Sequence, residues 1–221
     1  MIRNAKTISL IGLLMGGVTL FSACIGVQAD ITVRADGSGM AVLEYRVSRV
    51  LEALGVLDGN ARWPPLPVGK ADFERTQERV PGLRLVSFST KEDAQDQYHQ
   101  VKLEFADIEA LVAFLDAAGL GASLVQERGQ HRLTLVFTQG RAGREDPDFL
   151  ALMEAAASGY GIALKLSFPG EGSLRVVDPA GPSVDPLPGM AVVPQGKQVS
   201  FTAPLGALLT HPQGLTLDLA W

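Results

Sequence analysis

Apolar and polar residues alternate along three pairs of segments, a pattern typical of strands with one buried face. The first pair, at residues 31–35 and 41–47, flanks a glycine-rich turn at residues 36–39. The second pair flanks the polar segment 91–97, and the third flanks residues 128–130. We therefore predict three β-hairpins along the chain.

Helical spacing of apolar residues follows each hairpin. Ser48 is placed to cap a short helix, and Asp72 to open another. Asp107 is placed to cap a helix whose apolar stripe runs over residues 108–115, and a further stripe runs over residues 149–156. The order of hairpin and then helix occurs three times, with little sequence identity between the copies.

The remaining segments complete a single predicted domain over residues 30–221. Strands are expected near residues 162–168, 174–177, 199–201 and 215–219, with a stiff proline-rich connector at 62–69 and a long loop at 178–197. Hairpins and amphipathic helices each have an apolar face that they cannot cover alone, so they pack as layers. The predicted fold class is α+β, with a curved antiparallel sheet built from repeated β-hairpin-plus-helix units and helices packed on one face.

The N-terminal residues have the pattern of an export signal. Arg3 and Lys6 form a basic region, and residues 7–29 contain no charge. The apolar part, residues 8–21, is shorter than a dedicated spanning helix. We predict a lipoprotein signal peptide at residues 1–23.

The signal ends in a segment that resembles the lipobox of bacterial lipoproteins. Residues 20–23 read Leu-Phe-Ser-Ala, with small residues directly before Cys24. A thiolate can accept a diacylglyceryl group as a thioether, which makes Cys24 the predicted lipidation site and first mature residue, followed by a short tether at 24–29. Phe21 departs from the strict pattern, which has Leu, Val or Ala there.

Two other outcomes for this segment stay open. Residues 27–29 form a small-residue site at which an ordinary signal peptidase would release a soluble periplasmic protein beginning at Asp30, and the segment could also remain as an uncleaved anchor. The chain has one cysteine, which cannot form an internal disulfide. Lipidation gives that residue a role, which favours the lipoprotein.

The order of elements is similar to that of the LppM-type bacterial lipoproteins. In that family an acylated cysteine precedes a strand, an Asp-Gly-rich turn and a second strand, and a Phe-Pro-Gly ends a late strand. Here Cys24, residues 30–33, residues 36–39 and residues 168–170 stand in those places. The resemblance implies an α+β domain at the cell envelope with affinity for lipids or glycolipids.

Charge and residue type exclude several function classes. The formal net charge is −5, and it becomes more negative when Arg3 and Lys6 leave with the signal, so nucleic acid is not an expected partner. No nucleophile elbow, phosphate-binding loop or dinucleotide fingerprint is present. The carboxylates of Glu92, Asp93 and Asp96 are expected at a solvated turn.

The histidines do not form a metal-ligand motif. His99, His131 and His211 lie far apart in sequence, and the chain has only one cysteine that could act as a further metal ligand. His99 and His131 could meet across a sheet, but we expect half-exposed strand positions for both. A hydrolase would need a polar pocket that joins one of them to a serine and a carboxylate. We predict no catalytic, cofactor-binding or metal-binding residue and expect a non-enzymatic protein.

The sequence thus predicts an exported protein anchored through acylated Cys24 to the inner or outer membrane, facing the periplasm or the cell surface. Its domain is expected to bind a lipid or other amphiphile, or an envelope protein partner. The apolar stripes 108–115 and 149–156 would line such a space, unless they form ordinary core between helix and sheet. The alternative is a structural subunit of an envelope assembly, with residues 63–67 as a contact.

Overall fold

The computed structural model describes residues 25–49, 69–127, 129–138, 147–177, 188–211 and 214–221. The predicted signal peptide at 1–23, the lipidation site Cys24 and nearly all of the connector at 62–69 lie outside the described residues. So do the helix expected after Ser48, beyond residue 49, and the first half of the predicted loop at 178–197.

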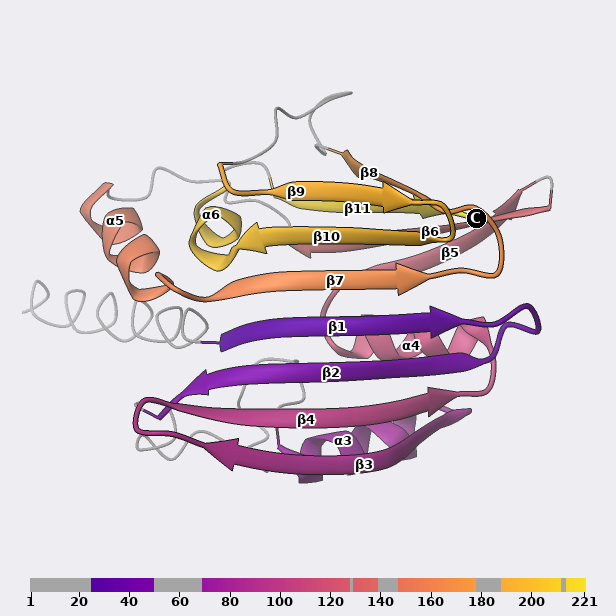
Figure 1. The fold of residues 1–221 in the computed structure, drawn as a ribbon, viewed down its shortest axis with the longest axis horizontal. Coiled ribbons are helices and arrows are strands. Elements are labelled where there is room, and N and C mark those ends of the chain that lie inside the picture. The colour runs from indigo at the N-terminus through magenta and orange to yellow at the C-terminus, as the bar shows by residue number, and fades with distance from the viewer. Residues whose placement is uncertain (1–24, 50–68, 128, 139–146, 178–187, 212–213) are drawn as a thin grey trace, which may run out of the picture.

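Seven strands form an open sheet in the order β3-β4-β2-β1-β7-β10-β9 (Figure 1). Their bounds are β1 Ile25–Val33, β2 Gly39–Ser48, β3 Leu83–Glu92, β4 Asp96–Phe105, β7 Gly161–Ser167, β9 Ala191–Gln195 and β10 Gln198–Pro204. Four more strands form a second sheet in the order β5-β6-β11-β8. These are β5 Ala122–Glu127, β6 Gln130–Thr138, β8 Ser173–Val177 and β11 Leu215–Ala220.

The fold is α+β, as predicted, and its sheets are open, but it differs from the predicted single antiparallel sheet in two respects. The strands divide between two sheets, and β1 and β7 run parallel, with Val27 opposite Ile162 and Ile31 opposite Leu166. Hairpin signals report only pairings between neighbours in sequence. The β1–β7 pairing joins segments more than a hundred residues apart, which alternation alone does not reveal.

The core lies on one side of the seven-stranded sheet. In Figure 1, helices α3 (Lys70–Arg79) and α4 (Ile108–Ala117) and the four-stranded sheet lie behind it. Odd-numbered residues of β1, β2 and β4 and even-numbered residues of β7 face this side, which follows from the two-residue period of a strand. The largest fully buried side chains there include Ile31, Leu103, Leu166, Phe73 and Phe114.

Helix α4 begins and packs as predicted. The Asp107 carboxylate accepts a hydrogen bond from the Ala110 backbone N–H at 2.8 Å, which is the N-cap expected from the sequence. Ile108, Leu111 and Leu115 are buried in the same cluster as the sheet residues. The stripe at 108–115 is therefore core between helix and sheet, and does not line a ligand space.

Helix α3 begins slightly before the predicted position. Its N-cap is Gly69, and the Asp72 carboxylate accepts a hydrogen bond from the Gly69 backbone N–H at 3.0 Å. Asp72 therefore stabilises the first turn from the third helical position, where an acidic side chain also complements the helix dipole. Helices α5 (Pro147–Ala156) and α6 (Leu205–Thr210) contact each other at the end of the sheet where β1 begins.

Two segments predicted without regular structure are strands. β1 begins at Ile25, so residues 25–29 belong to the sheet and do not form the tether predicted at 24–29. Residues 191–195 form β9 at the sheet edge, inside the loop predicted at 178–197. The alternation of β1 does extend back to Ile25 and Val27, but these residues are uncharged and directly follow the signal, which favours the tether predicted there. Residues 191–195 lack the alternation of apolar and polar residues and contain a proline. Pro194 fits β9 because edge strands tolerate proline.

Gly39 is required where β2 starts. A Cβ atom at this position would collide with the Thr32 carbonyl oxygen and with the Phe105 ring. The backbone of the first hairpin can approach β4 and its aromatic side chain only because residue 39 has no side chain. This close packing fixes one end of the central strands.

Candidate functional site

The face of the seven-stranded sheet opposite the core carries polar side chains in rows across the strands. One row consists of Gln100 on β4, Glu44 on β2, Gln28 on β1, Ala163 on β7 and Thr202 on β10. Its four polar members are exposed. Since strand residues alternate between faces, these positions are fixed by the same register that buries the core.

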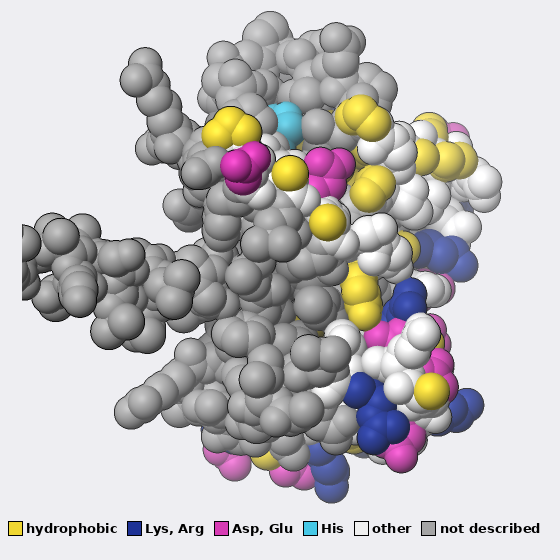
Figure 2. Space-filling model, turned by 90° about the vertical axis from the view of Figure 1, so that its left-hand side faces the viewer, with side chains coloured by type: hydrophobic (Ala, Val, Ile, Leu, Met, Phe, Trp, Pro, Cys, Tyr) yellow, Lys and Arg dark blue, Asp and Glu magenta, His cyan; other side chains and the backbone are white. Residues whose placement is uncertain are grey.

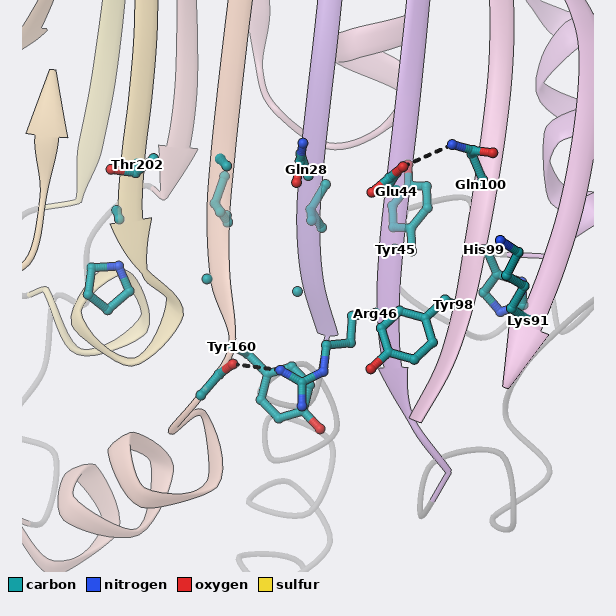
Figure 3. Close-up of a pocket in the computed structure, with 18 of the residues that line it drawn as sticks. Gln28, Glu44, Tyr45, Arg46, Lys91, Tyr98, His99, Gln100, Tyr160 and Thr202 are labelled. Atoms are coloured by element: carbon teal, nitrogen blue, oxygen red, sulfur yellow. Dashed lines mark hydrogen bonds between the residues drawn. The ribbon is translucent and has the colours of Figure 1, made fainter. Parts of the chain in front are cut away.

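A hollow of about 860 Å³ lies over this row and the next one toward the start of β1 (Figure 3). The second row consists of Lys91, Tyr98, Arg46 and Gly26. The hollow is deepest where three small residues adjoin longer ones; these are Gly26, Gly161 and Ala163. The volume falls in the range of small-molecule sites.

The hollow is lined by an acidic and a basic side chain, Glu44 and Lys91, which lie apart from each other and are not paired directly (Figure 3). The Gln100 amide donates from Nε2 to Oε1 of Glu44 at 2.9 Å, which orients the carboxylate on β2. Lys91 is exposed on β3, two strands away. Basic and acidic side chains also lie next to one another on the described part of this end of the molecule (Figure 2).

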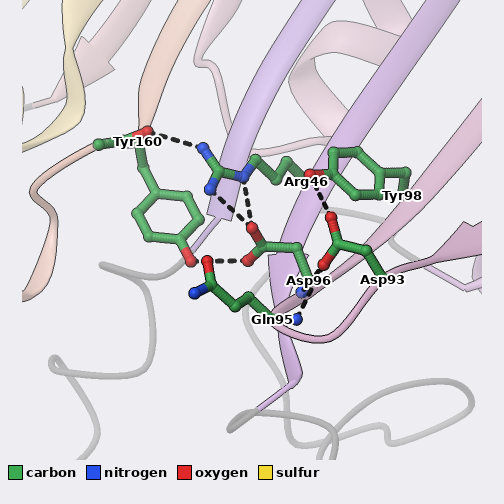
Figure 4. A network of polar contacts seen from close by, with 7 residues as sticks. Arg46, Asp93, Gln95, Asp96, Tyr98 and Tyr160 are labelled. Atoms are coloured by element: carbon green, nitrogen blue, oxygen red, sulfur yellow. Dashed lines mark hydrogen bonds and ion pairs between the residues drawn. The ribbon is translucent and has the colours of Figure 1, made fainter.

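An ion pair between a partly exposed arginine and a buried carboxylate borders the hollow where β2 ends and β4 begins (Figure 4). Asp96 is only 2% exposed, and its Oδ2 accepts a hydrogen bond from Arg46 Nε at 2.6 Å. The Tyr160 hydroxyl donates to Asp96 Oδ1 at 2.9 Å, and Arg46 Nη1 donates to the Gly159 carbonyl at 3.0 Å. The Arg46 guanidinium also lies 4.9 Å from the centre of the Tyr160 ring. These contacts join β2, β4 and the segment before β7.

A second carboxylate shapes the turn between β3 and β4. Asp93 Oδ1 accepts hydrogen bonds from the backbone N–H groups of Gln95 and Asp96, each at 2.8 Å, and the Tyr98 hydroxyl donates to Oδ2 at 3.1 Å. The turn is thus shorter and more ordered than the solvated segment expected at 91–97. Asp96 in particular is buried, which is contrary to the expectation of a solvated carboxylate.

The protonation equilibria follow these contacts. The backbone hydrogen bonds from Asp96 and Gln95 lower the pKa of Asp93, and the bond to Asp93 raises the pKa of Tyr98. Burial, and then the bond to Asp96, raises the pKa of Tyr160. Burial raises the pKa of Tyr45, whose ring packs against Phe73 on the core side of β2. At neutral pH the three tyrosines present neutral hydroxyl groups.

The two strand histidines lie in different sheets, so they do not meet. His99 on β4 is buried at 7% exposure, with Nδ1 3.0 Å from the Thr90 hydroxyl. His131 on β6 is partly buried and stacks on Trp221 at a centroid distance of 5.4 Å. The expectation of half exposure is therefore wrong for His99, whose ring packs as part of the core.

His211 follows α6 and also lies apart from the other two histidines. Within the described ranges, no group of three or more His, Cys, Asp or Glu residues is arranged to hold a metal ion. Across the same residues, no helix has the length and hydropathy needed to cross a bilayer.

Comparison with known proteins gives no match to a family model, a curated protein or a solved structure. The resemblance to LppM-type lipoproteins therefore stays a prediction.

The residues of the hollow carry no signal that identifies them in the sequence. The local pattern puts Gln28 in the predicted tether, and Glu44 and Arg46 on the solvent face of a hairpin. Polar residues at alternate strand positions are ordinary on a solvated face, so they do not distinguish a site. The small residues Gly26 and Ala163, which come together only through the parallel β1–β7 pairing, have no mark in the sequence.

Proposed function

We propose that the chain is an exported, membrane-anchored envelope lipoprotein, acylated at Cys24, and that its domain is a non-enzymatic binding module for an amphiphile of the envelope. The observation that carries the proposal is the position of β1. This strand begins at Ile25, directly after Cys24, and lies between β2 and β7 in the middle of the seven-stranded sheet.

The position of β1 favours cleavage before Cys24 over cleavage after Ala29. Residues 25–29 pair with residues 43–47 of β2, and residues 27–29 pair with residues 162–164 of β7. A protein that begins at Asp30 would lose this half of the strand and leave backbone groups of two neighbours without their partners. Buried backbone groups without hydrogen bonds are costly. The soluble periplasmic alternative is therefore disfavoured.

The same strand places the hollow beside the anchor. Gly26 lines the hollow and lies two residues after Cys24, so their Cα atoms are at most about 7 Å apart. An acylated cysteine holds its sulfur at the membrane surface, and two or three acyl chains make that attachment effectively permanent. On this proposal, the hollow opens at the level of the lipid headgroups.

The hollow favours the binding module over the second candidate function, which is a structural subunit with no ligand pocket. A hollow of about 860 Å³, with a few polar side chains among apolar lining atoms, has the size and composition of a ligand site. It lies on the open face of the sheet, whereas the sequence pattern predicts a lining along the stripes 108–115 and 149–156, unless they form ordinary core between helix and sheet. An envelope protein partner is the occupant that the structural alternative requires.

We further propose that the domain is built from hairpin-plus-helix units repeated in order along the chain. The element order β3-β4-α4 followed by β5-β6-α5 supports this. The two hairpins belong to different sheets, so any such repeat concerns order along the chain and not a continuous stack.

Intact mass of protein recovered from membranes tests the anchor. We expect a mature chain that begins at Cys24 with added acyl mass, and a Cys24→Ala variant that lacks the acyl mass and leaves the membrane fraction. Ser22→Ala is the matched control, because it keeps a small residue before the cysteine and should be processed normally. A soluble product that begins at Asp30 would contradict the proposal.

A further inference from the structure

The charged side chains around the hollow narrow the class of ligand. Arg46 is held by Asp96, which offsets its charge, so Glu44 and Lys91 are the two charges available to a ligand. Oε1 of Glu44 already accepts from Gln100, which leaves its other oxygen toward the hollow. Within the described part of the chain, no hydrogen bond or ion pair holds the Lys91 ammonium.

These two charges are separated in space. Glu44 and Lys91 lie on strands separated by β4 and are offset by two residues along the sheet. Standard strand spacing puts their Cα atoms about 10–12 Å apart, with both side chains on the open face. A ligand that bridges them must carry a cationic group for Glu44 and an anionic group for Lys91.

We propose that the hollow binds the zwitterionic headgroup of a bilayer phospholipid, with its primary ammonium at Glu44 and its phosphate at Lys91. The inference rests on the anchor at Cys24, since the anchor sets the height of the hollow above the membrane. The polar headgroup region of each leaflet is about 5–8 Å thick, comparable to the reach of the two residues from Cys24 to Gly26.

Other ligand classes fit the site less well. A purely anionic headgroup would meet Lys91 but also the Glu44 carboxylate, which repels it. An acyl chain would desolvate Gln28, Gln100 and Thr202 without providing hydrogen bonds. An extended peptide adds to a sheet through the backbone of an edge strand, and here the backbone groups of β1 and β2 are already paired within the sheet. The acyl chains of the bound lipid would stay in the bilayer.

The binding test uses the acylated full-length chain in a non-ionic detergent, with acylation verified by intact mass. Dihexanoyl phosphatidylethanolamine is titrated by calorimetry beside dihexanoyl phosphatidylglycerol and free phosphoethanolamine. We expect saturable binding of phosphatidylethanolamine, with the phosphatidylglycerol at least about tenfold weaker, as loss of one charge-assisted contact implies.

Two isosteric or near-isosteric variants assign the charges. Glu44→Gln should abolish the preference between the two lipids, and Lys91→Gln should weaken both of them about five- to tenfold. The matched controls are Glu104→Gln and Lys102→Gln, which lie on the same face of β4 outside the hollow and should bind as the parent does. Circular dichroism melts establish that each variant is folded.

Several results would overturn the inference. Equal binding of phosphatidylglycerol, or equal binding of an uncharged short-chain glycolipid, would exclude recognition of a zwitterion. Free phosphoethanolamine carries the same ammonium and phosphate, so comparable binding is expected, whereas binding at least about tenfold tighter than that of the lipid would identify a free phosphomonoester, and not the bilayer, as the source of the ligand. Titration of the full-length Cys24→Ala chain separates the two proposals. If the Cys24→Ala chain binds the lipid and intact mass shows that the parent chain is not acylated, the anchor alone is refuted. If the parent chain is acylated but does not bind the lipid, the headgroup site alone is refuted.

Discussion

The guanidinium of Arg46 donates from Nε to the buried carboxylate of Asp96 at 2.6 Å, although the two residues are far apart in sequence. Arg46 is 41% exposed, so this pair couples a buried anion to a cation at the surface. The contact therefore joins the end of β2 to the start of β4 beside the hollow. Its loss should affect both the stability of the protein and the structure of the hollow.

Asp96→Asn should destabilise the protein by about 1–3 kcal/mol, because an amide replaces the charge-assisted acceptor of Arg46 and Tyr160. The free energy of unfolding from urea titration at neutral pH measures this. Glu104→Gln is the control, since its pairing with Arg84 is exposed and should change the stability by less than about 0.5 kcal/mol. Equal effects of the two changes would contradict a special role for the Asp96 contact.

Gly39→Ala should destabilise the protein by about 3 kcal/mol or more, because the added methyl group collides with the Thr32 carbonyl and the Phe105 ring. Gly170→Ala is the matched control, because no atom lies within 4 Å of the place its methyl group would occupy. Thermal unfolding of both variants beside the parent gives the comparison. A well-folded Gly39→Ala protein with an unchanged Tm would show that the hairpin does not pack on β4 as described.

The free energy of unfolding should fall at alkaline pH because the Tyr45 hydroxyl is buried. Burial raises its folded-state pKa above the value near 10 of an unfolded tyrosine, so the contribution is fully present below about pH 10. It is lost as the pH rises further, by up to about 1.4 kcal/mol per pH unit. Unfolding free energies measured between pH 8 and 11 should fall less steeply for Tyr45→Phe. Tyr98→Phe, at an exposed position, should flatten the curve less, and equal flattening would argue against the burial of Tyr45.

Ile31→Ala should cost about 2–5 kcal/mol, because the Ile31 side chain is fully buried in the core between the two sheets. Thr32→Ala changes the neighbouring residue on the exposed face of β1 and should stay within about 0.5 kcal/mol. Chemical denaturation of the two variants checks the orientation of the strand. A reversed order of effects would mean that the register of β1 is shifted by one residue.

Local structure is predictable where one segment contains its own signal. The alternation at 41–47 and the Asp107 cap identify β2 and α4, because strand period and capping chemistry act over a few residues. The start of β1 also carries this pattern, since apolar residues alternate from Ile25 to Val33, but residues 25–29 share the uncharged composition of the preceding signal, which conceals the strand. The parallel pairing of β1 with β7 also escapes prediction, because nothing within either segment specifies a distant partner.

The candidate site is not predictable for the same reason. Glu44 and Gln100 come from different hairpins, and the sequence pattern puts Lys91 in a turn. Their proximity is a product of strand order. Asp96 shows the limit most clearly, since a carboxylate in a polar stretch is expected to be solvated, and only the tertiary fold brings Arg46 and Tyr160 over it.

The parallel pairing of β1 with β7 has a consequence for how the protein matures. β1 is the first described strand to be synthesised, yet one of its two neighbours is completed only at Ser167. On the proposed export route, the backbone groups on one side of β1 would stay unpaired until β7 has been translocated. Assembly of the sheet would therefore be slow and would depend on chaperones that bind unfolded chains. Acylation at the adjacent cysteine would give the waiting strand a fixed position at the bilayer while the rest of the sheet arrives.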